Sequence, residues 1–488
     1  MLHRALASAV PPFLAGPGER PHDAAGGWAW AAAWATARGH ARRVPAGPIR
    51  FVLLWLLAIA IRVPFIQAVP SVAGVVPDGM QALPVEVWGW RLPTSPLAAA
   101  IPDALARALA SVIGPSPVLP RLVAALLAAA TVPLAYGLAR ELVRPVGRRR
   151  LEDEFAGPRL AGLLGALLLA TSAAHVVIAG HVPGAPAIAP LLFVAALFAL
   201  ERALAVRDGR WLVAGGLLLG LALQSGPTAW VLVPGMAFAL WRVGRGLMLS
   251  RWGAAGLLAF LAACGPLLAV LLRGDADRTS DARGGDAAAL GRGGALASRA
   301  DGILSPVGAY VEMLGADLLL LSRLLAGQLG GTPPGDEVFA GALAWPYAGL
   351  ALLGLAILIL RGRPLLPFAA LSGVLALPLL GPSVGLTEGP VAGGPGMLPL
   401  LMVLVAIGIV ASGAALGTLA PLVSRRGSVA RLLVGMALLA LVLAPLPRLY
   451  GYYAEYGGHG TGASVPAGYH RVGDAESGPR SAADRAGR

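Results

Sequence analysis

Apolar runs of about 18 residues or more recur along most of this chain, and they restrict its fold more than any other feature. Lipid offers backbone N–H and C=O groups no water, so a membrane-spanning segment must be a helix or part of a closed barrel. The runs are rich in Leu and Ala and lack period-2 alternation, which favours helices. The chain is 57% hydrophobic and 13% charged, with a mean hydropathy of +0.73, which excludes an ordinary soluble globule. The sequence therefore predicts an all-α polytopic membrane protein.

The runs predict a bundle of about eleven transmembrane helices. The expected spans are about 51–68, 118–139, 160–180, 187–206, 211–225, 228–241, 252–272, 343–360, 364–381, 395–417 and 430–447. We expect residues 1–49 to form a partly disordered cytoplasmic arm, 50–448 the transmembrane domain, and 449–488 a polar tail.

Two long loops, about 69–117 and 273–342, interrupt the series of spans. Each contains a stretch with apolar residues at helical spacing, "SPLAAAIPDALARALASVIG" in the first loop and "YVEMLGADLLLLSRLLAGQL" in the second. Apolar residues on one face and charges on another are typical of a helix that lies on a membrane surface. We therefore expect one amphipathic helix in each loop.

Arginines predict the orientation of the bundle. The net charge is +13, and all 38 basic residues are arginine. The short loops "RPVGRRR", "RDGR", "RVGRGLMLSR", "RGR" and "SRRGSVAR" are rich in arginine, as cytoplasmic loops are. This predicts a multi-pass protein of the inner (plasma) membrane with a cytoplasmic N-terminus, and with both long loops and the C-terminus outside. Since the arginines lie between apolar runs, they indicate anionic membrane lipids as partners and no nucleic acid.

Several kinds of site are missing from the sequence. Cys264, the single cysteine, lies inside an apolar run, so no disulfide framework or thiol metal site is expected. There is no Walker motif, no Cys/His cluster and no Gly-rich nucleotide loop. The sequence thus identifies no cofactor and no metal ligands, leaves a divalent cation open, and lacks a cytosolic domain for a nucleotide sugar.

The order of segments resembles the GT-C glycosyltransferases. Motifs such as "TSPLAAAIPDALARAL…IGPSPVLPRLVAALLAAATVPLAYGLAREL", "RLAGLLGALLLATSAAHVVIAGHV" and "GGPGMLPLLMVLVAIGIVASG" occur in the family's order over about residues 50–420. They are most similar to the dolichyl-phosphate-mannose protein mannosyltransferase and aminoarabinose transferase type. The chain departs from that pattern where the family's acidic pair reads Asp78-Gly79, where "HPPLY" reads "TSPLA", and where a late "RY" reads "GPGM".

The resemblance implies transfer of a sugar from a polyprenyl phosphate to a glycan, lipid or protein acceptor outside the membrane. An acid in the first outer loop would act as general base on the acceptor, and Asp78 stands at the matching position. Glu86 is a second candidate for this catalytic role. Each acid also has a simpler structural interpretation. Asp78 stands in Pro-Asp-Gly, a sequence that favours a turn, and Glu86 precedes Trp88 and Trp90, which are typical of residues at the membrane–water interface.

A departing lipid phosphate needs positive charge or hydrogen-bond donors nearby. The candidates are Arg62 at the outer end of the first span, Arg121 at the start of the second, and His175 and His181 at the end of the third. Arg62 could instead extend its charge to the headgroups, Arg121 could be an ordinary boundary residue, and the histidines could be structural.

Glu388 lies in the short outer loop "SVGLTEGPVAGG" and is a candidate for the acceptor side, or a solvated residue.

Two other functions remain open, a transporter or lipid flippase and a catalytically inactive GT-C-like scaffold. A transporter should carry charged residues in mid-span, whereas here most acids lie in the expected outer loops.

Overall fold

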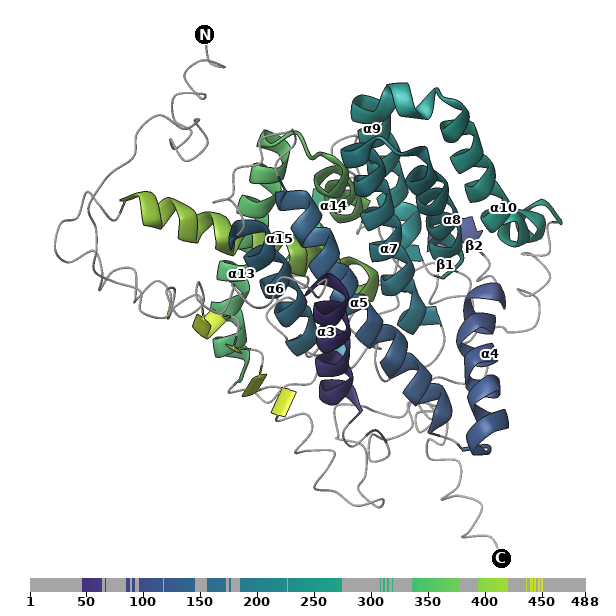
Figure 1. The fold of residues 1–488 in the computed structure, drawn as a ribbon, viewed down its shortest axis with the longest axis horizontal. Coiled ribbons are helices and arrows are strands. Elements are labelled where there is room, and N and C mark those ends of the chain that lie inside the picture. Colours follow the sequence, from purple (N-terminus) through teal and green to yellow (C-terminus); the bar gives the residue numbers. More distant parts are fainter. Residues whose placement is uncertain are drawn as a thin grey trace, which may run out of the picture.

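The computed structural model describes part of the chain. The described residues are 46–63, 66, 85–87, 90–92, 96–116, 118–144, 156–172, 175–176, 185–225, 227–273, 336–376 and 394–419, with single positions between 308 and 318 and between 436 and 450. Over these ranges the protein is a helical bundle with one small hairpin (Figure 1). The expected arm 1–49, apart from its last residues, and the tail 449–488, apart from its first two, lie outside them.

Most of the bundle consists of long apolar helices. They are α3 (Ala46–Arg62), α5 (Leu119–Val143), α6 (Ala156–Thr171), α7 (Ala185–Val206), α8 (Gly209–Ser225), α9 (Pro227–Met248), α10 (Arg251–Arg273), α13 (Asp336–Leu360), α14 (Leu365–Ala376) and α15 (Gly394–Leu419). In the first long loop, strands β1 (Val85–Val87) and β2 (Trp90–Leu92) pair antiparallel, with Glu86 opposite Arg91.

The amphipathic helix expected in the first long loop is present. It is α4 (Pro96–Ile113), which packs on α5 and leaves Leu105, Val112 and Ile113 exposed. It stands at the edge of the bundle in Figure 1. The helix expected in the second loop, and the span 430–447, fall almost entirely outside the described residues.

The count of eleven spans stays a prediction. Among the described helices, Leu119–Val143 and Ala187–Val206 are both long and apolar enough to cross a membrane. Five further apolar helices are shorter, namely Gly157–Thr171, Arg251–Leu267, Trp345–Leu360, Leu365–Ala376 and Met397–Gly413. Large apolar side chains on outer helices are exposed, such as Leu56 on α3 and Leu258 on α10, as suits helices whose outer faces meet lipid.

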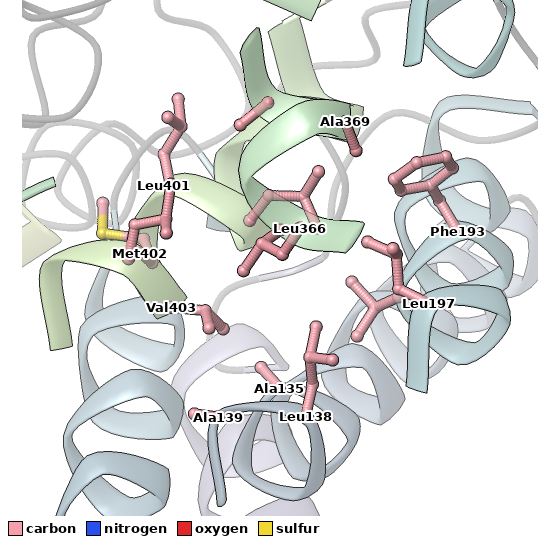
Figure 2. Packing of buried hydrophobic residues seen from close by; sticks show 14 of the residues in the cluster. Ala135, Leu138, Ala139, Phe193, Leu197, Leu366, Ala369, Leu401, Met402 and Val403 are labelled. Carbon is pink, nitrogen blue, oxygen red and sulfur yellow. The ribbon is translucent and has the colours of Figure 1, made fainter. Parts of the chain in front are cut away.

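Helix α15 forms the centre of the core. Every residue from Met397 to Ile409 is buried, and α15 packs against α6, α13, α7 and α5. In Figure 2, Leu401, Met402 and Val403 of this helix lie among apolar side chains of α5, α7 and α14. A helix that is apolar on all sides suits a protein core or a membrane span, and here the neighbouring helices cover residues 397–409.

Two predicted spans end earlier than expected. The first, predicted to reach 68, ends at Arg62, because Pro64 restricts the backbone of Val63 and stops the helix. The third, predicted to reach 180, ends at Thr171. Beyond it, residues 175–176 are π-helical, with the backbone N–H of Val176 donating to the Ser172 carbonyl (2.9 Å), and the Ser172 hydroxyl oxygen accepts from the backbone N–H of His175 (3.4 Å).

Contacts between helix termini show which ends lie together. The Arg121 guanidinium at the start of α5 donates to the Ile66 carbonyl just beyond α3 (3.4 Å). At the other end of α5, Arg361 from the α13–α14 turn donates to the Val143 carbonyl (3.1 Å). The bundle therefore has two distinct ends. We call the end where α3 finishes at Arg62 and α5 begins the Arg62 end, and the end where α5 finishes, close to Glu141, the Glu141 end. Arg121 and Glu141 are about 30 Å apart along α5 at 1.5 Å per residue.

Glycines bring α13 and α15 into close contact, which yields a test of the packing. A methyl group on Gly354 would lie 2.1 Å from the Leu404 carbonyl oxygen, whereas one on Gly349 of the same helix would have nothing within 4 Å. We expect Gly354→Ala to lower the free energy of unfolding by about 1–3 kcal/mol, because the helices must separate. Gly349→Ala should be neutral or stabilising by up to about 1 kcal/mol, because alanine favours helix. Thermal unfolding in detergent measures both, and equal melting temperatures for the two variants would contradict this packing.

Candidate functional site

The strongest candidate site lies where the end of α3 meets the end of α6. Arg62, the last residue of α3, is fully buried, with 0% of its surface exposed. One nitrogen of its guanidinium donates to the Ala58 carbonyl (3.1 Å), and the other donates to the Leu169 carbonyl of α6 (3.4 Å). The interpretation in which Arg62 extends toward the lipid headgroups is therefore wrong. Its charge points into the bundle, where it satisfies a carbonyl near the end of α6.

Arg62 also fixes the chemical form of His175. The Nη2 nitrogen of Arg62 lies 2.7 Å from Nδ1 of His175, which is itself completely buried. A guanidinium has only donors, so Nδ1 must be the acceptor of this hydrogen bond. The imidazole is then neutral and carries its proton on Nε2. Arg62 thus holds His175 as a hydrogen-bond donor at one defined atom.

The Nε2–H group of His175 is left available. It is buried and has no hydrogen-bond partner in the part of the chain that the structure describes. A buried donor without a partner costs roughly 1–3 kcal/mol, and such groups are rare in native proteins. They occur where a ligand or an ordered water completes the site. Nε of Arg363 and Oε1 of Glu201, at the other end of the bundle, are also buried without a partner among the described residues, but they belong to two charges that contact each other, whereas His175 is a neutral side chain with a donor left for a ligand.

The other predicted residues fall into two groups. Arg121 lies at the same end of the bundle as Arg62, since its guanidinium contacts the Ile66 carbonyl. Glu86 lies on β1. Asp78, His181 and Glu388 lie outside the described residues. The structure therefore brings Arg62 and His175 into contact, with Arg121 near them, and the roles of all seven candidate residues stay proposals.

A second polar cluster, at the Glu141 end, was missed by reasoning from sequence. The Glu141 carboxylate of α5 accepts from Arg202 of α7 (3.0 Å) and lies 3.9 Å from Arg144. The neighbouring Glu201 is 1% exposed and accepts from Arg363 in the α13–α14 turn (3.3 Å). The adjacent Glu201 and Arg202 inside an otherwise apolar run were the available signal, because charges in such runs are costly unless paired.

This cluster joins three parts of the fold. Arg363 also donates to the Arg144 carbonyl (3.4 Å), so the turn between α13 and α14 is tied to α5 as well as α7. Each buried carboxylate has a guanidinium partner, and both acids lie within the last two turns of their helices. The cluster therefore fastens helix ends together. Across the described residues, no three His, Cys, Asp or Glu side chains are grouped to hold a metal ion.

No protein-family model and no curated protein matches the chain. One similar solved structure is the Archaeoglobus fulgidus oligosaccharyltransferase in complex with zinc and sulfate. The two are 14% identical, the match covers 82% of this chain and 52% of the other, and the TM-score is 0.43. This chain thus spans about half the length of that protein, and at this similarity the neighbour assigns it neither substrate nor mechanism.

The buried pair at the Glu141 end provides a test of the fold. Arg363→Leu leaves the Glu201 charge buried without its partner, and we expect a loss of about 3–5 kcal/mol in unfolding free energy. Arg363→Leu combined with Glu201→Leu should recover most of that loss, because no isolated charge remains. Arg202→Leu is the matched control. Its side chain is 30% exposed and Glu141 keeps Arg144 nearby, so the loss should be smaller. Denaturant unfolding measures all three, and a double variant as unstable as Arg363→Leu would contradict the pairing.

Proposed function

We propose that this chain is a membrane glycosyltransferase of the GT-C type that uses a sugar carried on a polyprenyl phosphate. The observation that carries the proposal is the buried contact between Arg62 and His175 (2.7 Å), which leaves a hydrogen-bond donor unused inside an apolar bundle. A phosphate attached to a membrane lipid is a ligand that could reach such a depth and use such a donor. The resemblance of the motifs over about residues 50–420 points to the same chemistry.

The phosphate would bind at the Arg62 end. The Nε2–H group of His175 would donate to a phosphate oxygen, while Arg62 and Arg121 supply positive charge at the same end. Positive charge and fixed donors stabilise the negative charge that develops on a leaving phosphate. In a water-poor site these interactions are stronger than in solution.

Asp78 would be the general base. It follows α3 in the segment that joins Arg62 to β1, so it belongs to the loop that leaves this end of the bundle. In the proposed step the acceptor oxygen forms a bond to the anomeric carbon of the sugar. The bond from that carbon to the phosphate oxygen breaks, and its electron pair stays on the phosphate. The acceptor proton passes to the Asp78 carboxylate.

Glu86 would be the second candidate for the general base, Glu388 would lie on the acceptor side, and His181 would add to the phosphate site. In this proposal the donor binds from the outer leaflet of the inner membrane and the acceptor is a hydroxyl or amine of a glycan, lipid or protein. The arginine-rich short loops support a cytoplasmic location for the opposite, Glu141 end.

The transporter alternative receives little support from the buried charges. Glu141 lies two residues before the end of α5, and Glu201 lies five residues before the end of α7. Both are paired with arginines. Transport sites usually lie near the middle of the membrane at interrupted helices, whereas these charges fasten helix ends.

A transfer assay tests the proposed function. Purified full-length protein in lipid is incubated with labelled polyprenyl-phosphate sugars and candidate acceptors. We expect Asp78→Asn to reduce kcat by about 10²–10⁴-fold, the usual contribution of a general base. His175→Phe should reduce kcat/KM for the donor by roughly 10–100-fold, because one hydrogen bond to a charged phosphate is lost.

Two control variants separate function from folding. Asp103→Asn removes an exposed acid on α4, within the same expected outer loop, and should leave the rate unchanged. His175→Gln keeps an N–H donor on the side chain and should retain more activity than His175→Phe. Transfer that survives Asp78→Asn would exclude Asp78 as the base. Absence of transfer with every donor would favour the scaffold or the transporter.

A further inference from the structure

The turn between α9 and α10 carries a cluster of exposed arginines and tryptophans. Trp241, Arg242 and Arg245 lie in the last turns of α9, and Arg251 and Trp252 begin α10. All three arginines are exposed, and Trp241 is 50% exposed. Within the described ranges none of the three guanidinium groups forms a hydrogen bond or an ion pair. We call these five residues the α9–α10 cluster.

The turn that carries the cluster is ordered by its own hydrogen bonds. The Ser250 hydroxyl donates to the Leu247 carbonyl (2.6 Å), and its oxygen accepts from the backbone N–H of Trp252 (3.2 Å). The ring of Trp252 packs on Gly209 at the start of α8, where a Cβ atom would lie 2.0 Å from the ring. Contacts at the start of α8 and at the start of α10 therefore fix the position of Trp252. The arginines of the cluster extend from this ordered turn.

The neighbouring start of α8 adds to the positive charge. Arg207 and Arg210 are exposed there, and the single acid beside them is Asp208. The Asp208 carboxylate accepts a hydrogen bond from the backbone N–H of Arg210 (3.0 Å), so it caps the N-terminus of α8. Residues 207–210 and 241–252 together hold five arginines and one aspartate. The surface has a strong surplus of positive charge and attracts anions.

Two of the arginines lie over tryptophan rings, and one of these pairs lines a shallow hollow. The Arg245 guanidinium is 5.0 Å from the centre of the Trp241 ring, and that of Arg251 is 5.5 Å from the Trp252 ring. Stacking on a ring restricts the guanidinium and leaves its N–H groups free to point outward. An open pocket of about 350 Å³ is lined by Arg251, Trp252 and Ala255. One guanidinium and one aromatic ring thus lie together at a shallow, open hollow.

An apolar face of α10 continues from this pocket. Ala255 and Leu258 follow Arg251 by four and seven residues, so they lie on the same side of the helix. Leu258 is 66% exposed, and Leu257 and Leu261 beside it are also exposed. A ligand seated on Arg251 would therefore meet an apolar surface one and two helical turns further along.

We propose that the α9–α10 cluster is a binding site for an anionic phospholipid. The phosphate of the headgroup lies against Arg251, Arg242 and Arg245 add positive charge from the end of α9, and an acyl chain lies along Leu258. The exposed arginines and the exposed leucines of α10 together indicate this ligand. Free phosphate would contact the arginines but not the leucines, and an acidic protein surface would leave the leucines uncovered. The proposal depends on residence in a membrane, and it is independent of glycosyl transfer.

Native mass spectrometry of the delipidated full chain tests the site. The protein is titrated in detergent with phosphatidylglycerol, with phosphatidylcholine, and with glycerol phosphate, which has the headgroup but no acyl chains. We expect phosphatidylglycerol to bind tightest. Arg242→Gln, Arg245→Gln and Arg251→Gln should each weaken its binding by about fivefold, and the triple variant by about 100-fold. Arg251→Lys should lie between wild type and Arg251→Gln.

Arg107→Gln is the matched control, because Arg107 is an exposed arginine on α4, outside the cluster, and its loss should change nothing. If the triple variant does not fold, the three single variants decide the result. Equal binding of phosphatidylglycerol and phosphatidylcholine would overturn the proposal, as would an Arg107→Gln effect as large as that of Arg251→Gln. Binding of glycerol phosphate as tight as that of phosphatidylglycerol would show a free-phosphate site and overturn the lipid assignment.

Discussion

A charge buried in an apolar bundle must find its partners inside that bundle, and this requirement determines how the helices meet. At one end Arg62 reaches carbonyl oxygens of α3 and α6 and the imidazole of His175. At the other end Glu201 and Arg363 bring α7 and the α13–α14 turn together. Between the two ends, α15 is covered on all sides by apolar side chains. The buried charges therefore link helices at both ends of the bundle, and apolar packing holds the helices between them.

The two ends differ in a way that suits different tasks. Each carboxylate of the Glu141 cluster has a guanidinium partner, and the exposed arginines of the α9–α10 cluster lie on the same side of the bundle, next to the start of α8. Both ends keep buried polar atoms without a partner among the described residues: Nε of Arg363 and Oε1 of Glu201 at the Glu141 end, and the Nε2–H group of His175 at the Arg62 end. The two atoms at the Glu141 end belong to charges that already contact each other, whereas the donor of His175 belongs to a neutral ring with one hydrogen bond left to offer a ligand. In our proposal the Arg62 end performs the chemistry, and the other end fastens helices and binds lipid.

Much of the helical arrangement could be predicted from hydropathy, and much of the site could not. Leu/Ala-rich runs located α5, α7, α8 and α10 closely, because apolar length is a strong local signal. The α-helix of α6 ends at Thr171 and π-helical residues follow at 175–176, a change of helix type that hydropathy does not detect. The contact of Arg62 with His175 joins residues 113 positions apart, and only the packed fold brings them together. Sequence could name both residues, but neither the buried position of Arg62 nor the tautomer of His175.

The most direct test of the central claim is the position of the lipid phosphate. An experimental structure of the full chain in a lipid nanodisc, with a bound polyprenyl phosphate, would measure it. The account predicts a phosphate oxygen at hydrogen-bond distance, about 2.7–3.2 Å, from Nε2 of His175, with the Arg62 to Nδ1 contact retained. A phosphate bound elsewhere, or an Nε2 atom that donates to the protein's own backbone in the presence of the lipid, would contradict it.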